Sequence, residues 1–134
     1  MSGVALGLGC DRGTPADTIA RAIDAALAQA GASLADVRAV ASIELKADER
    51  GLRELAARRG WSIAFYPPAE LASVAVPNPS ETVRRYTGTP SVSAAAALLA
   101  AGADLTALLV EKHKLHGADG RNATVSVARL PASD

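Results

Sequence analysis

The feature that most constrains the fold is the junction at residues 4–15, where an apolar run passes through a glycine-rich stretch into an amphipathic segment. Residues 4–8 are short and apolar, as in a strand buried on both faces of a parallel sheet. Residues 16–30 repeat apolar side chains at helical spacing, and Gly31 is suited to end that helix. Thr14 is predicted to cap the helix, with Pro15 in its first position. A strand, a glycine-rich turn and a helix in this order predict an α/β fold.

The rest of the chain repeats the alternation of strands and helices. Strands are predicted at residues 37–43, 61–66, 105–114 and 123–130, and helices at residues 48–60, 69–74, 80–85 and 92–101. The turn at residues 117–120 predicts an antiparallel hairpin of the last two strands. We therefore expect one domain over residues 1–134: a three-layer α/β/α sandwich with a mixed, mostly parallel five-stranded sheet and a C-terminal hairpin. Residues 131–134 are expected to fray.

Composition narrows the classes of function. Of the 134 residues, 14 are acidic and 14 basic, so no overall field favours nucleic acid or an anionic membrane. Aromatic residues make up 3%, too few for a nucleic-acid stacking platform. No apolar run reaches the roughly 20 residues of a membrane span, and residues 1–20 lack the pattern of a signal peptide, so a cytoplasmic location is expected. The single cysteine and two isolated histidines predict neither a disulfide nor a metal site, and no cofactor is predicted.

The glycine-rich turn is predicted to attract an anion. Backbone N–H groups near Gly9 and Gly13, the start of a helix, and the charge of Arg12 are expected to converge there. Two alternatives stay open. The turn serves packing alone, or it binds a dinucleotide, for which its glycine spacing is one residue too long and Glu44 is the candidate ribose-binding acid.

Further donors follow later strands. Lys46 comes after the second predicted strand, and Lys112 and Lys114 share one face of the fourth, with His113 on the other. Ser91 offers N–H and hydroxyl donors at the start of the alanine-rich helix. The carboxyl ends of parallel strands meet at one edge of a sheet, so these groups are predicted to share a pocket for a polycarboxylate. The alternative is that the lysines are simply solvated.

The candidates for acid–base or nucleophilic chemistry are few. Cys10 precedes a helix start and lies beside Arg12, a setting that lowers a thiol pKa, although a buried structural cysteine is the favoured interpretation. His113 and Glu49 are the other candidate catalytic groups. The catalytic residues stay open at this point.

Several motifs together resemble a known family. In chain order they are Gly7-x-Gly9-Cys10-x-Arg12-Gly13-Thr14, the pattern at residues 41–52, the alanine-rich stretch at residues 90–98, Lys112-x-Lys114, and the strand at residues 124–129. From about residue 4 to residue 130, the chain resembles the CobE / CbiG C-terminal domain family of cobalamin (vitamin B12) biosynthesis, and in extent it is most similar to the stand-alone CobE members. It departs from the family pattern at Asp11, usually basic, and at Ala94, usually a glutamate.

The resemblance implies a protein that binds or carries a precorrin-type tetrapyrrole through its carboxylates, alone or with other enzymes of the pathway. The candidate contacts are Gly9, Cys10, Arg12, Gly13, Thr14, Lys46, Ser91, Lys112 and Lys114. The longer CbiG proteins imply an alternative, a cobalt-precorrin-5A hydrolase that opens a lactone and releases acetaldehyde. Which intermediate, which metal state of the ring and which oligomeric state apply stays open.

Overall fold

The computed structural model describes residues 3–131, so the predicted fraying of residues 132–134 lies outside the described residues. Its strands are β1 (Val4–Cys10), β2 (Val37–Ile43), β3 (Ile63–Tyr66), β4 (Leu108–His116) and β5 (Asn122–Arg129). Its helices are α1 (Ala16–Ala30), α2 (Arg50–Arg59), α3 (Pro68–Ala72), α4 (Glu81–Thr87) and α5 (Ser93–Ala101). Short 3₁₀ turns occupy Leu34–Asp36, Glu44–Lys46 and Leu105–Ala107. No helix within residues 3–131 is long and apolar enough to cross a membrane.

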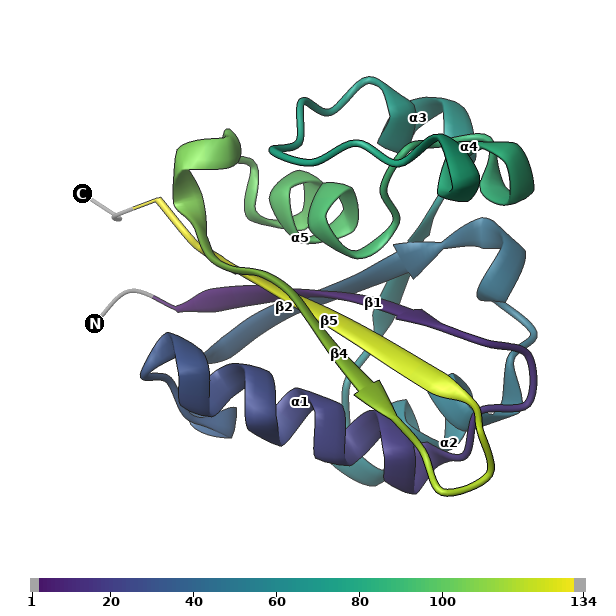
Figure 1. Ribbon diagram of the computed structural model, residues 1–134. Helices are drawn as coiled ribbons and strands as arrows, with labels where there is room; N and C mark the ends of the chain where they lie inside the picture. Colours follow the sequence, from purple (N-terminus) through teal and green to yellow (C-terminus); the bar gives the residue numbers. More distant parts are fainter. Residues whose placement is uncertain (1–2, 132–134) are drawn as a thin grey trace.

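The five strands form one mixed sheet in the order β3-β2-β1-β5-β4. Strands β1, β2 and β3 pair in parallel, whereas β5 lies antiparallel between β1 and β4. Helices α1 and α2 cover one face of the sheet, and α3, α4 and α5 cover the other (Figure 1). The predicted fold class, a three-layer α/β sandwich closed by an antiparallel hairpin, is confirmed.

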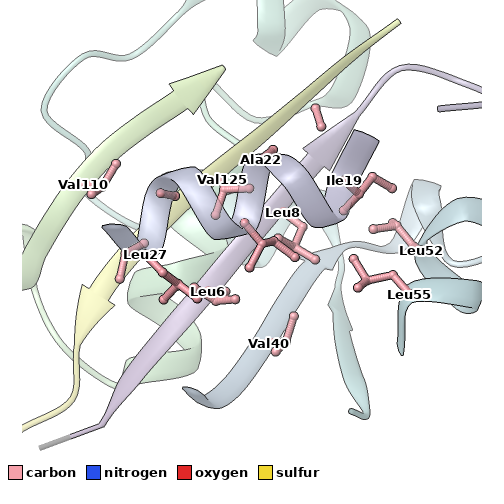
Figure 2. Close-up of a cluster of buried hydrophobic side chains, with 14 of the residues drawn as sticks. Leu6, Leu8, Ile19, Ala22, Leu27, Val40, Leu52, Leu55, Val110 and Val125 are labelled. Atoms are coloured by element: carbon pink, nitrogen blue, oxygen red, sulfur yellow. The ribbon is translucent and has the colours of Figure 1, made fainter. Parts of the chain in front are cut away.

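The two faces are packed differently. On the α1 side, large aliphatic side chains such as Leu6, Leu8 and Ile19 pack together in a buried core (Figure 2). On the other side, the alanine-rich α5 lies very close to β1, where a Cβ at Gly7 would overlap the backbone of Ser93. The small residues of α5 therefore allow the close approach, and Gly7 requires it.

The pairing of β4 with β5 shifts register twice, between Leu108 and Val110 and between Val110 and His113, and these shifts set which way the side chains of β4 point. Between the pairs Val110↔Val127 and His113↔Val125, β4 advances three residues while β5 advances two. The extra residue reverses the alternation, so Val110 and His113 share the face towards α1 although three positions separate them. Lys112 and Lys114 consequently point to the opposite face, which re-aims side chains as bulges often do.

Two local predictions are wrong. Pro15, not Thr14, is the N-cap of α1, and the helix begins at Ala16, because the Thr14 hydroxyl donates to the carbonyl oxygens of Asp11 (2.7 Å) and Asn122 (3.3 Å) instead. Strand β4 begins at Leu108, because residues 105–107 form a 3₁₀ turn. The capping glycine at residue 31 is confirmed, with φ of 70°.

Candidate ligand-binding site

A cavity of about 430 Å³ opens at the carboxyl ends of β1 and β2. We call it the lysine pocket; its lining comes from the segments 9–12, 43–46, 83–87, 92–93, 112–114 and 122–124. These are the turn after β1, the turn after β2, α4, the start of α5 and the hairpin. Ligands of open α/β sheets bind at this edge, and the volume is within the range of small-molecule sites.

The basic residues of the pocket are its most distinctive feature. The sequence contains three lysines, Lys46, Lys112 and Lys114, and all three line this cavity. Among residues 3–131, none of these lysines forms an ion pair with an acidic side chain within 4.0 Å. The chain therefore places three uncompensated positive charges around one hollow, as predicted for their convergence.

Arg12 also lines the pocket, but its charge is shared with the protein. Its guanidinium donates to Asp48 at 3.2 Å, to Glu49 at 3.5 Å and to the carbonyl oxygen of Leu45 at 3.3 Å. The side chain is 67% exposed, so these contacts are individually weak. An anion at Arg12 would compete with two carboxylates.

The floor and one wall of the pocket are apolar. Ile43 is fully buried beneath it, and Val92 lines it from the segment before α5. Leu45, Val83 and Tyr86 complete the apolar part from the turn after β2 and from α4. A ligand that fits both surfaces carries negative charge on one side and an apolar body on the other.

The glycine-rich turn is held by protein groups rather than left open. The N–H of Gly13 donates to the Glu49 carboxylate at 2.7 Å, and the N–H of Asp11 donates to the carbonyl oxygen of Asn122 at 3.0 Å. Asp11 in turn accepts from the backbone and side chain of Asn122 at 2.8 and 3.0 Å. The acid that departs from the family pattern therefore ties the turn to the hairpin.

Three predicted contacts lie outside the pocket. Gly13 and Thr14, with the start of α1, line a separate hollow built from residues of segments 13–17 and 50–58, which we call the α1–α2 hollow. The expectation that the start of α1 converges on the anion site is therefore wrong: β1 runs on to Cys10, and the turn then leads to the other face of the sheet. Ser91 is 4% exposed and does not line the pocket, although Val92 and Ser93 do.

Cys10 lines the pocket but is not an activated thiol. Its pKa is raised to about 11, chiefly by burial; Lys46 and Arg12 lower it, and Glu49 and Asp11 raise it. The setting beside Arg12 therefore does not lower the thiol pKa, because loss of solvent outweighs the nearby positive charges, and this agrees with the favoured interpretation of a structural cysteine.

The other two catalytic candidates do not face the cavity. Glu49 is 4% exposed and engaged with Arg12 and the backbone of Gly13. His113 lies on the α1 face of the sheet, as predicted, where its Nδ1 is 2.7 Å from the amide of Gln29. Glu44, considered as a ribose-binding acid, does not line the pocket. Among the described residues, no three His, Cys, Asp or Glu side chains are arranged to hold a metal ion.

Sequence reasoning missed the apolar wall. Tyr86 and Val83 reach the pocket from α4, a short helix that carries no motif, and Leu45 reaches it from a 3₁₀ turn. The sequence signal that could have indicated this wall is the scarcity of aromatic residues, because the sequence has four and Tyr86 is the one in this helix.

Fold and site together define a class of protein, an α/β domain with a cation-lined, apolar-floored pocket at the carboxyl edge of its sheet. The chain belongs to the cobalamin synthesis G C-terminus family, whose sequence profile matches residues 4–128. The family belongs to cobalamin biosynthesis, and within it this chain is CobE-like.

Individual relatives agree with this assignment. Protein CobE of a Sinorhizobium species is 41% identical over 113 residues, covering 83% of this chain and 73% of the relative. The crystal structure of CobE from the cobalamin pathway superposes with a TM-score of 0.79 at 35% identity, covering 99% of this chain and 94% of that one. A cobalt-precorrin-5A hydrolase of Priestia megaterium is 43% identical over 128 residues, covering 96% of this chain, which spans only 32% of the hydrolase's length.

Proposed function

We propose that the chain binds and carries a precorrin-type tetrapyrrole intermediate, gripping its carboxylate arms in the lysine pocket. The three lysines are the observation that supports this most directly. Their charges surround one hollow and meet no acidic partner among the described residues, so a polyanionic guest would gain attractive contacts without displacing an ion pair.

The apolar floor supports a ring rather than a small anion. Phosphate or sulfate would meet the lysines but leave Ile43 and Val92 without a partner. A macrocycle with acetate and propionate arms presents an apolar body together with its carboxylates, and so matches both parts of the lining. Arg12 would add a further contact, weakened by Asp48.

The test is a titration with uroporphyrin, a planar macrocycle that bears carboxylates around its rim, followed by absorbance and by calorimetry. We expect saturable binding that weakens as sodium chloride is raised, because the contacts are charge-assisted and partly exposed. Cobyrinic acid, a corrinoid polycarboxylate, is the second probe. Absence of saturable binding by both probes at low salt would refute the proposal.

A second function, lactone opening of the cobalt-precorrin-5A hydrolase type, is favoured by the 43% identity to that hydrolase. Cys10 is the candidate nucleophile that reaches the pocket, and its raised pKa keeps it protonated at neutral pH. Glu49 and His113 face other parts of the protein. The carrier role is therefore preferred.

This second function has its own test, incubation of the purified chain with a lactone-bearing cobalt-precorrin and an assay for acetaldehyde. We expect no acetaldehyde above the protein-free control. Acetaldehyde release that is lost in Cys10→Ser would establish the hydrolase and displace the carrier proposal.

A further inference from the structure

We propose that Tyr86 is the ring-contacting residue of the lysine pocket, stacking its phenol against the flat face of a conjugated macrocycle while the lysines hold the acidic arms. This inference rests on the proposed function and adds to it a specificity-determining residue. Tyr86 lies in α4, a helix outside the family motifs given above.

Tyr86 differs from the other aromatic residues. Trp61 and Phe65 pack against the core on the α1 side, and Tyr66 packs against the cluster below α5. Tyr86 joins none of the hydrophobic clusters among the described residues and is 80% exposed, yet it lines the pocket. A large aromatic ring left in water beside a cavity is a typical feature of a binding surface.

The helix that carries Tyr86 has no buried residue of its own. Its N-terminal end is nevertheless fixed in place. The Asn78 amide donates to the Glu111 carboxylate at 2.7 and 2.8 Å, next to the bulge that turns Lys112 to the pocket, and Ser80 caps the helix by accepting from the N–H of Val83 at 3.2 Å. Packing of the core therefore does not explain why an aromatic residue stands here.

The other exposed apolar residues support the same site. Four large hydrophobic side chains are exposed among residues 3–131, and two of them, Tyr86 and Leu45, line the lysine pocket. The other two, Leu105 and Leu109, do not. Exposed apolar surface and uncompensated charge are thus gathered at one place, which fits an amphipathic guest with a flat body and acidic arms.

The experiment compares Tyr86→Ala, Tyr86→Phe and Leu109→Ala in uroporphyrin titrations over a series of salt concentrations. Because Tyr86 is 80% exposed, its replacement is expected to leave folding intact, and circular dichroism and thermal unfolding check this for each variant. Loss of one stacked aromatic contact predicts about fivefold to tenfold weaker binding for Tyr86→Ala. Tyr86→Phe keeps the ring and is expected to bind as the wild type does, as is the control Leu109→Ala.

A second readout separates stacking from charge. The Soret band shift of bound uroporphyrin is expected to shrink in Tyr86→Ala and to return in Tyr86→Phe, while the dependence of the affinity on salt stays that of the wild type. Wild-type affinity in Tyr86→Ala, or failure of Tyr86→Phe to restore it, would refute the role of Tyr86 and leave the lysine pocket standing. Loss of uroporphyrin and cobyrinic acid binding by the wild type itself would refute the proposed function and this inference together.

Discussion

The two hollows beside the glycine-rich turn are both bordered by basic residues, but those residues are paired with acids in one hollow and, among the described residues, mostly unpaired in the other. In the α1–α2 hollow, Arg58 meets Asp17 at 2.8 Å and Arg50 meets Glu54 at 3.4 Å. In the lysine pocket, the three lysines have no acidic partner within 4.0 Å among the described residues. The same turn thus separates a neutralised surface from one that keeps its charge available.

The comparison shows that basic residues alone do not mark a site in this chain. It contains 14 lysines and arginines, and those outside the lysine pocket include members of intramolecular ion pairs. Arg12 lies between the two cases, because it lines the pocket but also contacts Asp48 and Glu49. The pocket is distinguished by three lysines without acidic partners among the described residues, together with an apolar floor.

The sharpest way to break the comparison is to remove the charges of each hollow in turn. Lys46→Ala, Lys112→Ala and Lys114→Ala combined are expected to weaken uroporphyrin binding roughly a hundredfold, taking each exposed charge contact as about 1 kcal/mol. Calorimetry at low salt measures the affinity. The matched control, Arg50→Ala with Arg58→Ala, should change it less than twofold, and a comparable loss in that control would show that only overall charge matters.

A second variant tests whether the α1–α2 hollow is structural. A Cβ at Gly51 would overlap the carbonyl oxygen of Thr14, a backbone atom that cannot move alone. Gly51→Ala is therefore expected to lower the free energy of unfolding by about 1–3 kcal/mol, as overpacking does, with ligand affinity retained. Urea denaturation provides the measurement. At Gly9, in the pocket, the added Cβ meets the Thr124 hydroxyl at 2.6 Å, which a rotamer change can relieve, so Gly9→Ala should destabilise less.

Arg12 provides a smaller and two-sided test. Arg12→Ala is expected to weaken uroporphyrin binding only about threefold, because the guanidinium already interacts with Asp48. Asp48→Asn should strengthen binding about twofold, since it removes a nearby negative charge and frees Arg12. Titration of both single variants and the double variant measures the coupling. An unchanged affinity in Asp48→Asn would show that the ion pair does not compete with the ligand.

The smallest effect at neutral pH is expected from Cys10. With its pKa raised from 9.0 to about 11, the thiol stays protonated, so its alkylation by iodoacetamide should be slow at pH 8 and keep rising beyond pH 10. Because the thiol ionises more easily in the unfolded chain than in the folded one, it contributes to the free energy of unfolding. This contribution is fully present below pH 9 and is lost as the pH rises towards 11. A plateau of the alkylation rate near pH 9 would contradict the burial of this thiol.

Much of the fold could be predicted from the sequence because local patterns and global structure agree. The apolar run at residues 4–8, the helical spacing after it and the hairpin turn each specify an element, and their order specifies the layers. The predicted helix cap was wrong because the side chain forms hydrogen bonds to other groups instead. Thr14 looks like a cap, but its hydroxyl finds carbonyl oxygens of Asp11 and Asn122, the latter 108 positions away.

The site was predictable only in part. That Lys112 and Lys114 share a face follows from alternation, but which face they share depends on two register shifts in the pairing of β4 with β5, which no composition signal marks. Gly9 lies at the lysine pocket and Gly13 at the α1–α2 hollow because β1 extends to Cys10. The pKa of Cys10 depends on its burial. Each of these properties is set by tertiary contacts.

The insertion of β5 between β1 and β4 has a consequence for synthesis on the ribosome. Because β5 pairs with β1 and carries Asn122 to Asp11, the cavity is assembled only after residues 108–129 have emerged from the ribosome. A chain that ends before β4 therefore lacks two of the three lysines of the pocket, together with the strand β5 that links β4 to the rest of the sheet.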